Sequence, residues 1–501
     1  MTFSHSRPPI VAAARERGRG RFSPLARSRT LAAATNQSLL NGNSSMIDVR
    51  AELRSIALIF FLAGFVFAHD GHDHDHKPRK AEDAETYRPT VVPDRIVLTW
   101  SDDPATTQSV TWRTDATVEK AFAEIAIAED GPKFRDSADR HSAKTVLYES
   151  NLGPAHYHSI TFTGLQPKTR YAYRVGDGVN WSEWNQFLTA SDTPEPFSFV
   201  YFGDAQNDVK SMWSRVVREA YRDAPKAAFL LHAGDLVNDA HSDGEWGEWF
   251  YAGGHIHRMV PCVPTPGNHE YDPILEDGLP TIEDYLSENW RPTFTLPENG
   301  PEGLEETAYW FDYQGARIVS LNSNRKIRQQ AEWLGGVLEN NPQEWTIVTF
   351  HHPIYSAKPE RDNPHIRAAW QPIFDKYQVD IVLQGHDHSY ARTGMVSAGE
   401  NVPTGVTARS EEGGTVYVVS VSGPKMYDVD PQKFMRRVGE DTQLYQIIHV
   451  DGDELRYEAR TAIGRLYDAF TLRKREGQVN EIIEQVPETP ERRRPPEARD
   501  R

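Results

Sequence analysis

Five short segments of the sequence end in side chains that bind metal ions, and each follows an apolar run typical of a buried strand. The segments are Gly203-Asp204, Gly234-Asp235, Gly267-Asn268-His269-Glu270, His351-His352-Pro353 and Gly385-His386-Asp387-His388. Carboxylate and amide oxygens combined with imidazole nitrogens suit ions such as zinc, manganese or iron. Because Cys262 is the only cysteine, an intramolecular disulfide and a cysteine-rich zinc site are excluded. The sequence therefore predicts a metal centre held by His, Asp and Asn.

The elements that must position these side chains are buried strands alternating with helices. Apolar runs at 197–202, 228–231, 345–350 and 381–383 have the composition of strands covered on both faces. Between the first two runs, Val209, Met212, Val216 and Ala220 recur at helical spacing. In open α/β sheets the carboxyl ends of the strands converge on the ligand crevice. The pattern predicts an α/β domain over residues 194–475 in which the five segments meet.

Residues 93–190 have a different sequence pattern. Short alternating runs at 96–100, 109–112, 158–162 and 170–175, several of them about ten residues apart, predict a β-sandwich that resembles a fibronectin type III module. No constellation of catalytic residue types stands out in this region. We expect it to act as a spacer or as a wall beside the neighbouring site.

The ordered series GD, GD, GNHE, HxP and GHxH, each after a predicted strand, resembles the metallophosphoesterase superfamily. The module at 93–190 and the stretch Gly385–Arg392 are similar to the purple acid phosphatase branch of that superfamily. The resemblance covers roughly residues 93–473. It implies a four-layer α/β/β/α sandwich, the calcineurin-like phosphoesterase domain, preceded by the all-β fibronectin-III-like module.

The resemblance also implies a dinuclear metal centre. Asp204 and His388 would bind the first metal ion. Asn268, His351 and His386 would bind the second, and Asp235 would bridge both, because a shared carboxylate is the simplest way to hold two cations close together. His269 would face the substrate and protonate the leaving oxygen. His352 follows a ligand directly, and we expect it to point away and to be structural.

Two positions depart from the family pattern. Purple members carry a tyrosine ligand three residues after the bridging aspartate, where this chain has Asn238. Other branches use a histidine two residues after the first aspartate, where this chain has Gln206. Either amide could supply a weak oxygen ligand, and water could take the place instead. The identity of the first metal, iron, zinc or manganese, is therefore open, because losing a phenolate lessens the preference for iron(III).

A third position concerns substrate binding. Arg361 stands about where the family has a substrate-facing histidine after the HxP segment. A guanidinium matches phosphate oxygens bidentately, so Arg361 is a candidate phosphate clamp. The alternative is a surface ion pair with Asp362 or Glu360.

The predicted reaction is hydrolysis of a phosphate monoester by metal-activated hydroxide, as in an acid phosphatase, on a small phosphate-ester substrate. Phosphodiesterase or nucleotidase activity on the same two-metal core is an alternative. A non-catalytic metal-dependent binding protein is a further one, suggested by the weakened first metal position. The formal charge of −17, from 72 acidic and 55 basic residues, opposes a nucleic-acid groove.

Both ends of the chain are predicted to lie outside the folded units. The apolar run 56–68 follows Arg50 and Arg54 and is short for a membrane span, so residues 1–68 are predicted to be a targeting region cleaved after Ala68. Export to the periplasm or medium follows, with no stable transmembrane anchor; the alternatives are an uncleaved anchor and a start at Met46 rather than Met1. Residues 69–92 form a histidine-rich linker that either gathers cations or is merely solvated. The Pro, Glu and Arg content of 476–501 predicts a disordered tail.

Overall fold

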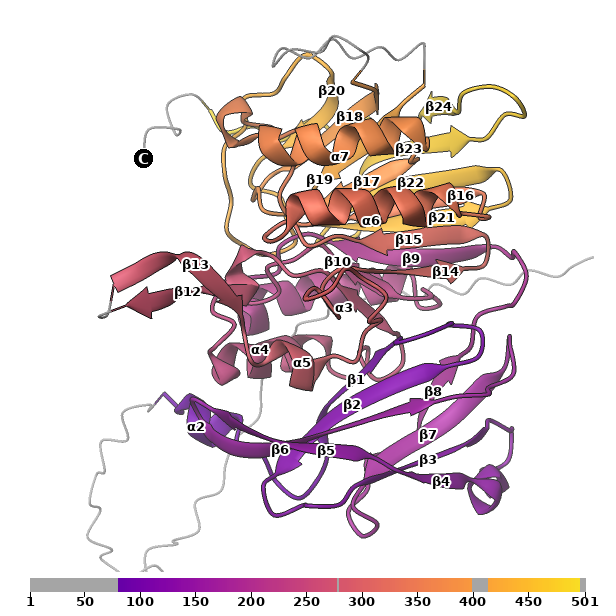
Figure 1. The fold of residues 1–501 in the computed structure, drawn as a ribbon, viewed down its shortest axis with the longest axis vertical. Coiled ribbons are helices and arrows are strands. Elements are labelled where there is room, and N and C mark those ends of the chain that lie inside the picture. Colours follow the sequence, from indigo (N-terminus) through magenta and orange to yellow (C-terminus); the bar gives the residue numbers. More distant parts are fainter. Residues whose placement is uncertain (1–79, 277–278, 399–412, 496–501) are drawn as a thin grey trace, which may run out of the picture. The chain divides into compact units, whose positions relative to one another are not determined.

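A computed structural model describes residues 80–276, 279–398 and 413–495 (Figure 1). The predicted targeting region 1–68 and the histidine-rich tract 69–76 lie outside the described residues. Within the described ranges, no helix has the length and apolar character needed to cross a bilayer.

The first folded part is an all-β sandwich of two four-stranded antiparallel sheets, in the orders β1-β2-β6-β5 and β4-β3-β7-β8. The strands are β1 Asp94–Thr99, β2 Gln108–Asp115, β3 Phe122–Ile127, β4 Asp139–Ser142, β5 Lys144–Ser150, β6 Gly153–Phe162, β7 Arg170–Gly176 and β8 Asn185–Leu188. Trp112 and Tyr173, one from each sheet, are fully buried in the core between them. The prediction of an N-terminal all-β unit is confirmed. Its likeness to fibronectin type III modules stays a prediction.

Strand β2 is buried along almost its whole length because it has a covered face on each side. Val110 and Trp112 point into the sandwich core. The intervening Thr111 lies 3.2 Å, hydroxyl to hydroxyl, from Thr295 of the following domain. The sandwich therefore forms a wall against the second domain.

The second domain contains two seven-stranded mixed sheets, in the orders β11-β10-β9-β21-β22-β23-β24 and β14-β15-β16-β17-β19-β18-β20. The first sheet consists of β9 Phe197–Phe202, β10 Leu230–His232, β11 Cys262–Pro264, β21 Leu444–Asp451, β22 Glu454–Thr461, β23 Leu466–Arg473 and β24 Glu481–Glu484. The second consists of β14 Tyr309–Tyr313, β15 Ala316–Ser320, β16 Trp345–Thr349, β17 Ile381–Gln384, β18 Tyr390–Val396, β19 Thr415–Val419 and β20 Met435–Gly439. A separate hairpin pairs β12 Tyr271–Glu276 with β13 Leu279–Leu286.

The two sheets pack face to face, and helices cover their outer faces (Figure 1). Phe199 and Ile447 of the first sheet share one core with Ile347 and Val416 of the second. Helices α3 Ser214–Asp223 and α4 Asp243–Gly253, with the short α5 Trp290–Thr293, lie on the first-sheet side, while α6 Ile327–Glu339 and α7 Pro364–Lys376 pack on the second sheet. The predicted α/β/β/α fold class is confirmed.

The end of the predicted linker is folded. Residues Asp83–Thr86 form the one-turn helix α2, and the ring of Tyr87 packs against α4 at Gly247, where a Cβ would lie 2.5 Å from that ring. The backbone oxygen of Tyr87 also accepts a hydrogen bond from Arg113 Nη2 at 2.9 Å. A short polar helix has no apolar stripe of its own, so the sequence pattern did not reveal this contact.

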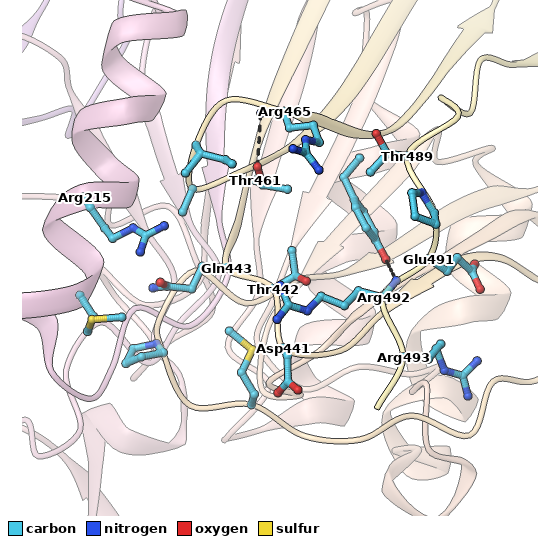
Figure 2. Close-up of a pocket in the computed structure, with 17 residues that line it drawn as sticks. Arg215, Asp441, Thr442, Gln443, Thr461, Arg465, Thr489, Glu491, Arg492 and Arg493 are labelled. Carbon is cyan, nitrogen blue, oxygen red and sulfur yellow. Dashed lines mark hydrogen bonds between the residues drawn. The ribbon is translucent and has the colours of Figure 1, made fainter. Parts of the chain in front are cut away.

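The prediction of a disordered tail over 476–501 is wrong for residues 476–495, the part that the structure describes. Strand β24 pairs with β23, and Glu440 N donates to the backbone oxygen of Arg492 at 2.8 Å. Arg494 forms an ion pair with Asp441. Figure 2 shows this segment, through Thr489 and Arg492, forming one side of a pocket. Pairing of charges and backbone groups orders a stretch whose composition offers little apolar surface.

A buried ion cluster joins the sandwich to the second domain. Asp243, at the start of α4, accepts from Arg95 Nη1 at 2.5 Å and from Arg113 Nη1 at 3.1 Å, and each of the three side chains is at most 3% exposed. Arg113 is also paired with Asp94 at 2.7 Å. Asp243 is thus the carboxylate on which two buried guanidinium groups converge.

We expect Asp243→Ala to lower the free energy of unfolding by about 3–5 kcal/mol, because it leaves buried guanidinium charge without its partner. Chemical denaturation measures the change. The control is Asp136→Ala, whose partner Arg135 is exposed, and it should change stability by no more than about 0.5 kcal/mol. Equal, small effects of the two substitutions would contradict the prediction.

Candidate metal centre

The six predicted ligands all lie just after the carboxyl ends of strands in the two sheets. Asp204 follows β9, Asp235 follows β10, and Asn268 follows β11. His351 follows β16, and His386 and His388 follow β17. Because β9, β10 and β11 run parallel, as do β16 and β17, these ends meet in one place.

Three of the ligand side chains form one group of donor atoms. Asn268 Oδ1 lies 2.9 Å from His386 Nδ1 and 3.1 Å from His351 Nε2. His351 donates through Nδ1 to the backbone oxygen of Ala233 at 2.9 Å, which turns its Nε2 toward the group. These are the residues predicted to hold the second metal ion.

The residues predicted to hold the first metal ion form a second group. Asp204 Oδ2 lies 3.3 Å from His388 Nε2. His388 Nδ1 donates to the backbone oxygen of Lys425 at 3.0 Å, so Nε2 is the acceptor nitrogen and faces the centre. Asp204 Oδ2 is buried and has no hydrogen-bond partner. A buried carboxylate oxygen without a partner fits a position where a cation supplies the missing contact.

Asp235 connects the two groups through one oxygen atom. Its Oδ2 lies 3.2 Å from His351 Nε2 and 2.8 Å from Gln206 Nε2, which in turn is 3.1 Å from His388 Nε2. Its Oδ1 accepts the backbone N–H of His269 at 2.9 Å. A carboxylate in this position can bridge two cations, and the donor set of oxygens and imidazoles fits divalent or trivalent ions.

The backbone around these ligands is tightly constrained. Asp235 has a φ of 50° and His386 a φ of 71°, conformations that non-glycine residues adopt rarely. A Cβ on Gly267 would lie 2.1 Å from Asp235 Oδ1, and one on Gly385 would lie 2.3 Å from Asp204 Oδ1. The glycines of the sequence motifs are therefore required by close approach of the backbone to the carboxylates.

Burial and mutual charge shift the titration of the site. Burial raises the pKa of Asp204 to about 7, an effect that His351 opposes and Asp235 reinforces. Burial would lower the pKa of His351, but Asp235 and Asp204 raise it to about 10. Burial would raise the pKa of Asp235, yet His351 holds it well below its usual range. A cation bound by His351 would have to displace the ring proton, so we expect cation binding to tighten as the pH rises.

Glu270 supports the bridging loop, a role that the sequence did not reveal. Its buried carboxylate accepts from the backbone N–H groups of Gly267 at 2.7 Å, Asp235 at 2.9 Å and Leu236 at 2.9 Å. Burial, together with the charge of Asp235, raises the pKa of Glu270 to about 8. The available signal was the G-x-x-E spacing of a capped turn, in which the acid satisfies the turn's free N–H groups.

Gln206 and Asn238, the two residues predicted as weak ligands, make different contacts. The Gln206 amide faces the Asp235 and His388 donor atoms, and its Oε1 is buried without a partner. Turning the amide by half a rotation would present that oxygen to the first ligand group. The Asn238 amide oxygen instead accepts from Asn207 Nδ2 at 2.9 Å. Of the two, Gln206 is the one that the structure brings to the ligand atoms.

The predicted substrate-facing residues border the same centre. His269 Nε2 lies 4.0 Å from Asp235 Oδ2, while its Nδ1 is 2.5 Å from the backbone oxygen of Asn238. Arg361 Nε donates to Asp387 Oδ1 at 2.5 Å, and its guanidinium lies 5.0 Å from the centre of the Tyr427 ring. The ion pair of Arg361 is thus formed with Asp387 of the GHDH motif, and neither Asp362 nor Glu360 is its partner.

His352 does not point away from the centre as expected. Its ring centroid lies 4.4 Å from that of His386, and Nδ1 is 2.9 Å from the hydroxyl of Ser323. Burial and the neighbouring His351 lower the pKa of His352 to about 3, so the ring is neutral. The hydrogen bond to Ser323 turns the ring into the site, a contact that no local pattern predicts.

Comparison with known proteins follows the same division of the chain. Residues 93–189 match the family Purple acid Phosphatase, N-terminal domain, and residues 197–390 match Calcineurin-like phosphoesterase. Purple acid phosphatase 18 of Arabidopsis thaliana is 24% identical over 363 residues, covering 70% of this chain and 78% of the relative. Fe(3+)-Zn(2+) purple acid phosphatase 12 of the same plant is 26% identical over 293 residues, covering 54% and 60%. A solved purple acid phosphatase from yellow lupin (Lupinus luteus) seeds has a similar fold, with a TM-score of 0.62 at 21% identity over 76% of this chain and 74% of that one.

We expect Glu270→Gln to weaken metal binding by about 10- to 100-fold, because an amide cannot accept all three backbone hydrogen bonds that position Asp235. Metal content after dialysis against a chelator measures the effect. Glu332→Gln, on the exposed face of α6, is the control and should retain its metal. Equal metal retention in the two variants would show that Glu270 does not position the bridge.

Proposed function

Because this chain belongs to the calcineurin-like metallophosphoesterases with a purple acid phosphatase N-terminal domain, and is a metal-dependent phosphoester hydrolase, we propose that it hydrolyses phosphate monoesters. The observation that carries the proposal is the position of Asp235 Oδ2 between two groups of ligand atoms. The names of the relatives, acid phosphatases among them, favour monoesters over diesters.

The proposed ligands are assigned by group. Asp204, His388 and Gln206 hold the first ion, Asn268, His351 and His386 hold the second, and Asp235 bridges them. Two cations bound there would supply Lewis acidity and lower the pKa of a water molecule. The unpartnered Asp204 Oδ2 and Gln206 Oε1 support the assignment of the first group.

His269 is the proposed general acid. Its Nδ1–H donates to the backbone oxygen of Asn238, which leaves Nε2 facing the site, 4.0 Å from Asp235 Oδ2. A proton on Nε2 can pass to the leaving oxygen from the imidazolium form, while Nδ1–H stays bonded to Asn238. Its side chain is 28% exposed, so it can reach a substrate.

Arg361 is the proposed phosphate clamp. Its Nε is held by Asp387, and neither of its Nη atoms has a hydrogen bond to another described residue. A guanidinium fixed at one edge presents the other edge to phosphate oxygens with little loss of side-chain freedom.

Export is also proposed, with the mature chain beginning at His69. The apolar run 56–68 and the small residue Ala68 support it. Amino-terminal sequencing of the protein recovered outside the cytoplasm should read His69-Asp70-Gly71. Recovery of the chain with residues 1–45 still attached would contradict the proposal.

Release of p-nitrophenol from its phosphate monoester by the metal-loaded protein tests the activity. We expect Asp235→Asn to lose metal and activity together, by at least about 100-fold, because the shared negative charge disappears. Asp239→Asn, four residues further along the same loop and exposed, is the control. Faster turnover of bis(p-nitrophenyl) phosphate would favour a diesterase. Two bound metals without turnover of either ester would favour a binding protein.

The iron-loaded protein should lack a strong visible charge-transfer band, because Asn238 replaces the tyrosine that binds iron(III) in purple members. The hydroxyl of Tyr201 donates to the backbone oxygen of Gln384, and that of Tyr390 donates to Asp468 at 2.7 Å, so both point elsewhere. Tyr427 packs on His388, with ring centroids 4.7 Å apart. An intense visible band that disappears in Tyr427→Phe would show that a phenolate ligand has moved there.

A further inference from the structure

A second cluster of metal-binding side chains lies outside the dinuclear centre and shares no residue with it. His232 ends β10, Cys262 begins β11, and His257 lies on the turn between α4 and β11. One ligand atom from each of the three lies within 4.8 Å of the other two, and all three residues are buried. In the parallel pairing of β10 with β11, Leu230 faces Cys262, so His232 and Cys262 lie on the same face of the sheet.

The imidazoles of this cluster have no hydrogen-bond partners. His232 is 1% and His257 0% exposed, and neither ring nitrogen of either residue is hydrogen-bonded. A buried polar group left in this state loses its hydrogen bonds to water without replacement, which destabilises the fold. Such a cost in a folded core calls for an occupant that the nitrogens can bind.

Aromatic packing does not satisfy these nitrogens. The ring of His257 stacks on Trp249 at 4.0 Å with an interplanar angle of 23°, so its nitrogens point along the ring plane and not at the indole face. A Cβ on Gly253 would lie 2.1 Å from Cε1 of His257, so the glycine leaves the room that this ring needs. Phe202, Trp213 and Phe250 contact the two imidazoles and complete an apolar wall.

We propose that His232, His257 and Cys262 form a binding site for a monovalent soft cation, Cu(I), held by one thiolate and two imidazole nitrogens. Thiolate and imidazole are ligands that copper accepts, and the soft thiolate favours Cu(I). On binding, the sulfur–copper bond forms as the thiol proton leaves to solvent. The thiolate then neutralises the ion, and the apolar pocket carries the same net charge as before.

A divalent ion fits the cluster less well. Structural zinc takes four tetrahedral ligands, and the cluster offers three donor atoms among the described residues. Zinc with one thiolate would also leave a positive charge in an aromatic pocket that lies within reach of the charge of Arg258.

Metal–ligand bonds of about 2.0 to 2.3 Å require the donor atoms to approach each other by up to about 1 Å, which ring rotation can supply.

Anaerobic titration of the full, zinc-loaded chain with Cu(I), in competition with a chromogenic Cu(I) chelator, tests the site. We expect a sulfur-ligated Cu(I) with thiolate-to-copper absorption in the ultraviolet, and one sulfur and two nitrogen neighbours by X-ray absorption. Cys262 is the only cysteine, so the thiolate signal reports on this cluster and not on the histidine-rich tract.

Matched variants assign the ligands. Cys262→Ser should abolish the thiolate signal, and His257→Gln should weaken the sulfur-ligated binding by at least about 10- to 100-fold. His255→Gln, on an exposed residue of the same turn, should leave it unchanged. Circular dichroism establishes that each variant is folded.

Two results would overturn the site. One is a folded wild-type chain that binds no sulfur-ligated copper. The other is a crystal of the copper-treated protein with water in the cluster, to which the unpartnered Nε1 of Trp249 would donate. Both readouts follow copper and sulfur, so neither depends on whether the proposed hydrolysis is observed.

Discussion

The carboxylate of Asp235 is shared between two groups of ligand atoms, and much of the second domain serves to hold it there. The buried carboxylates of Asp204 and Asp235 repel each other unless positive charge lies near them. In the protein alone, Asp235 and Asp204 raise the pKa of His351 to about 10 although burial opposes them, so a proton on this ring supplies part of the missing positive charge. The cluster is stable as a set only when positive charge is present, so the binding of cations and the order of the surrounding loops are coupled.

This constraint explains the local backbone. The strand ends bring the predicted ligands to one place. Their final close approach depends on glycines, which have no Cβ, and on left-handed backbone conformations at Asp235 and His386. Three backbone N–H groups donate to Glu270, and these bonds join the loop that carries Asp235 to the turn that carries Asn268. Strained backbone is retained where the surrounding hydrogen bonds leave no alternative.

The strand patterns were sufficient to predict an α/β domain whose strand ends converge, and the resemblance to a known family implied the four-layer fold class and the six predicted ligands that the structure brings together. Residues whose role depends on contacts with neighbouring side chains were harder to predict from the sequence. Glu270 resembles any acid in a turn, and the orientation of His352 depends on Ser323, which is distant in sequence. The order of residues 476–495 comes from pairing with Arg437, Glu440 and Asp441, which composition cannot show. Likewise, His232, His257 and Cys262 form no motif, because α4 and a turn separate them along the chain.

The order of strands in the first sheet also determines when the fold can close. Strand β9 lies between β10 and β21, with Phe197 opposite Val450, so its outer edge is filled by a segment made about 250 residues later. Pairing over such a separation is slow, since the entropy of closing the loop between the partners must be overcome before the contacts form. During synthesis, Asp204 and Asp235 emerge long before His386, His388 and the strands that complete the sheet. If the proposed export begins before the last strands are made, the chain crosses the membrane with an incomplete set of metal ligands. It would then bind its metal ions after export.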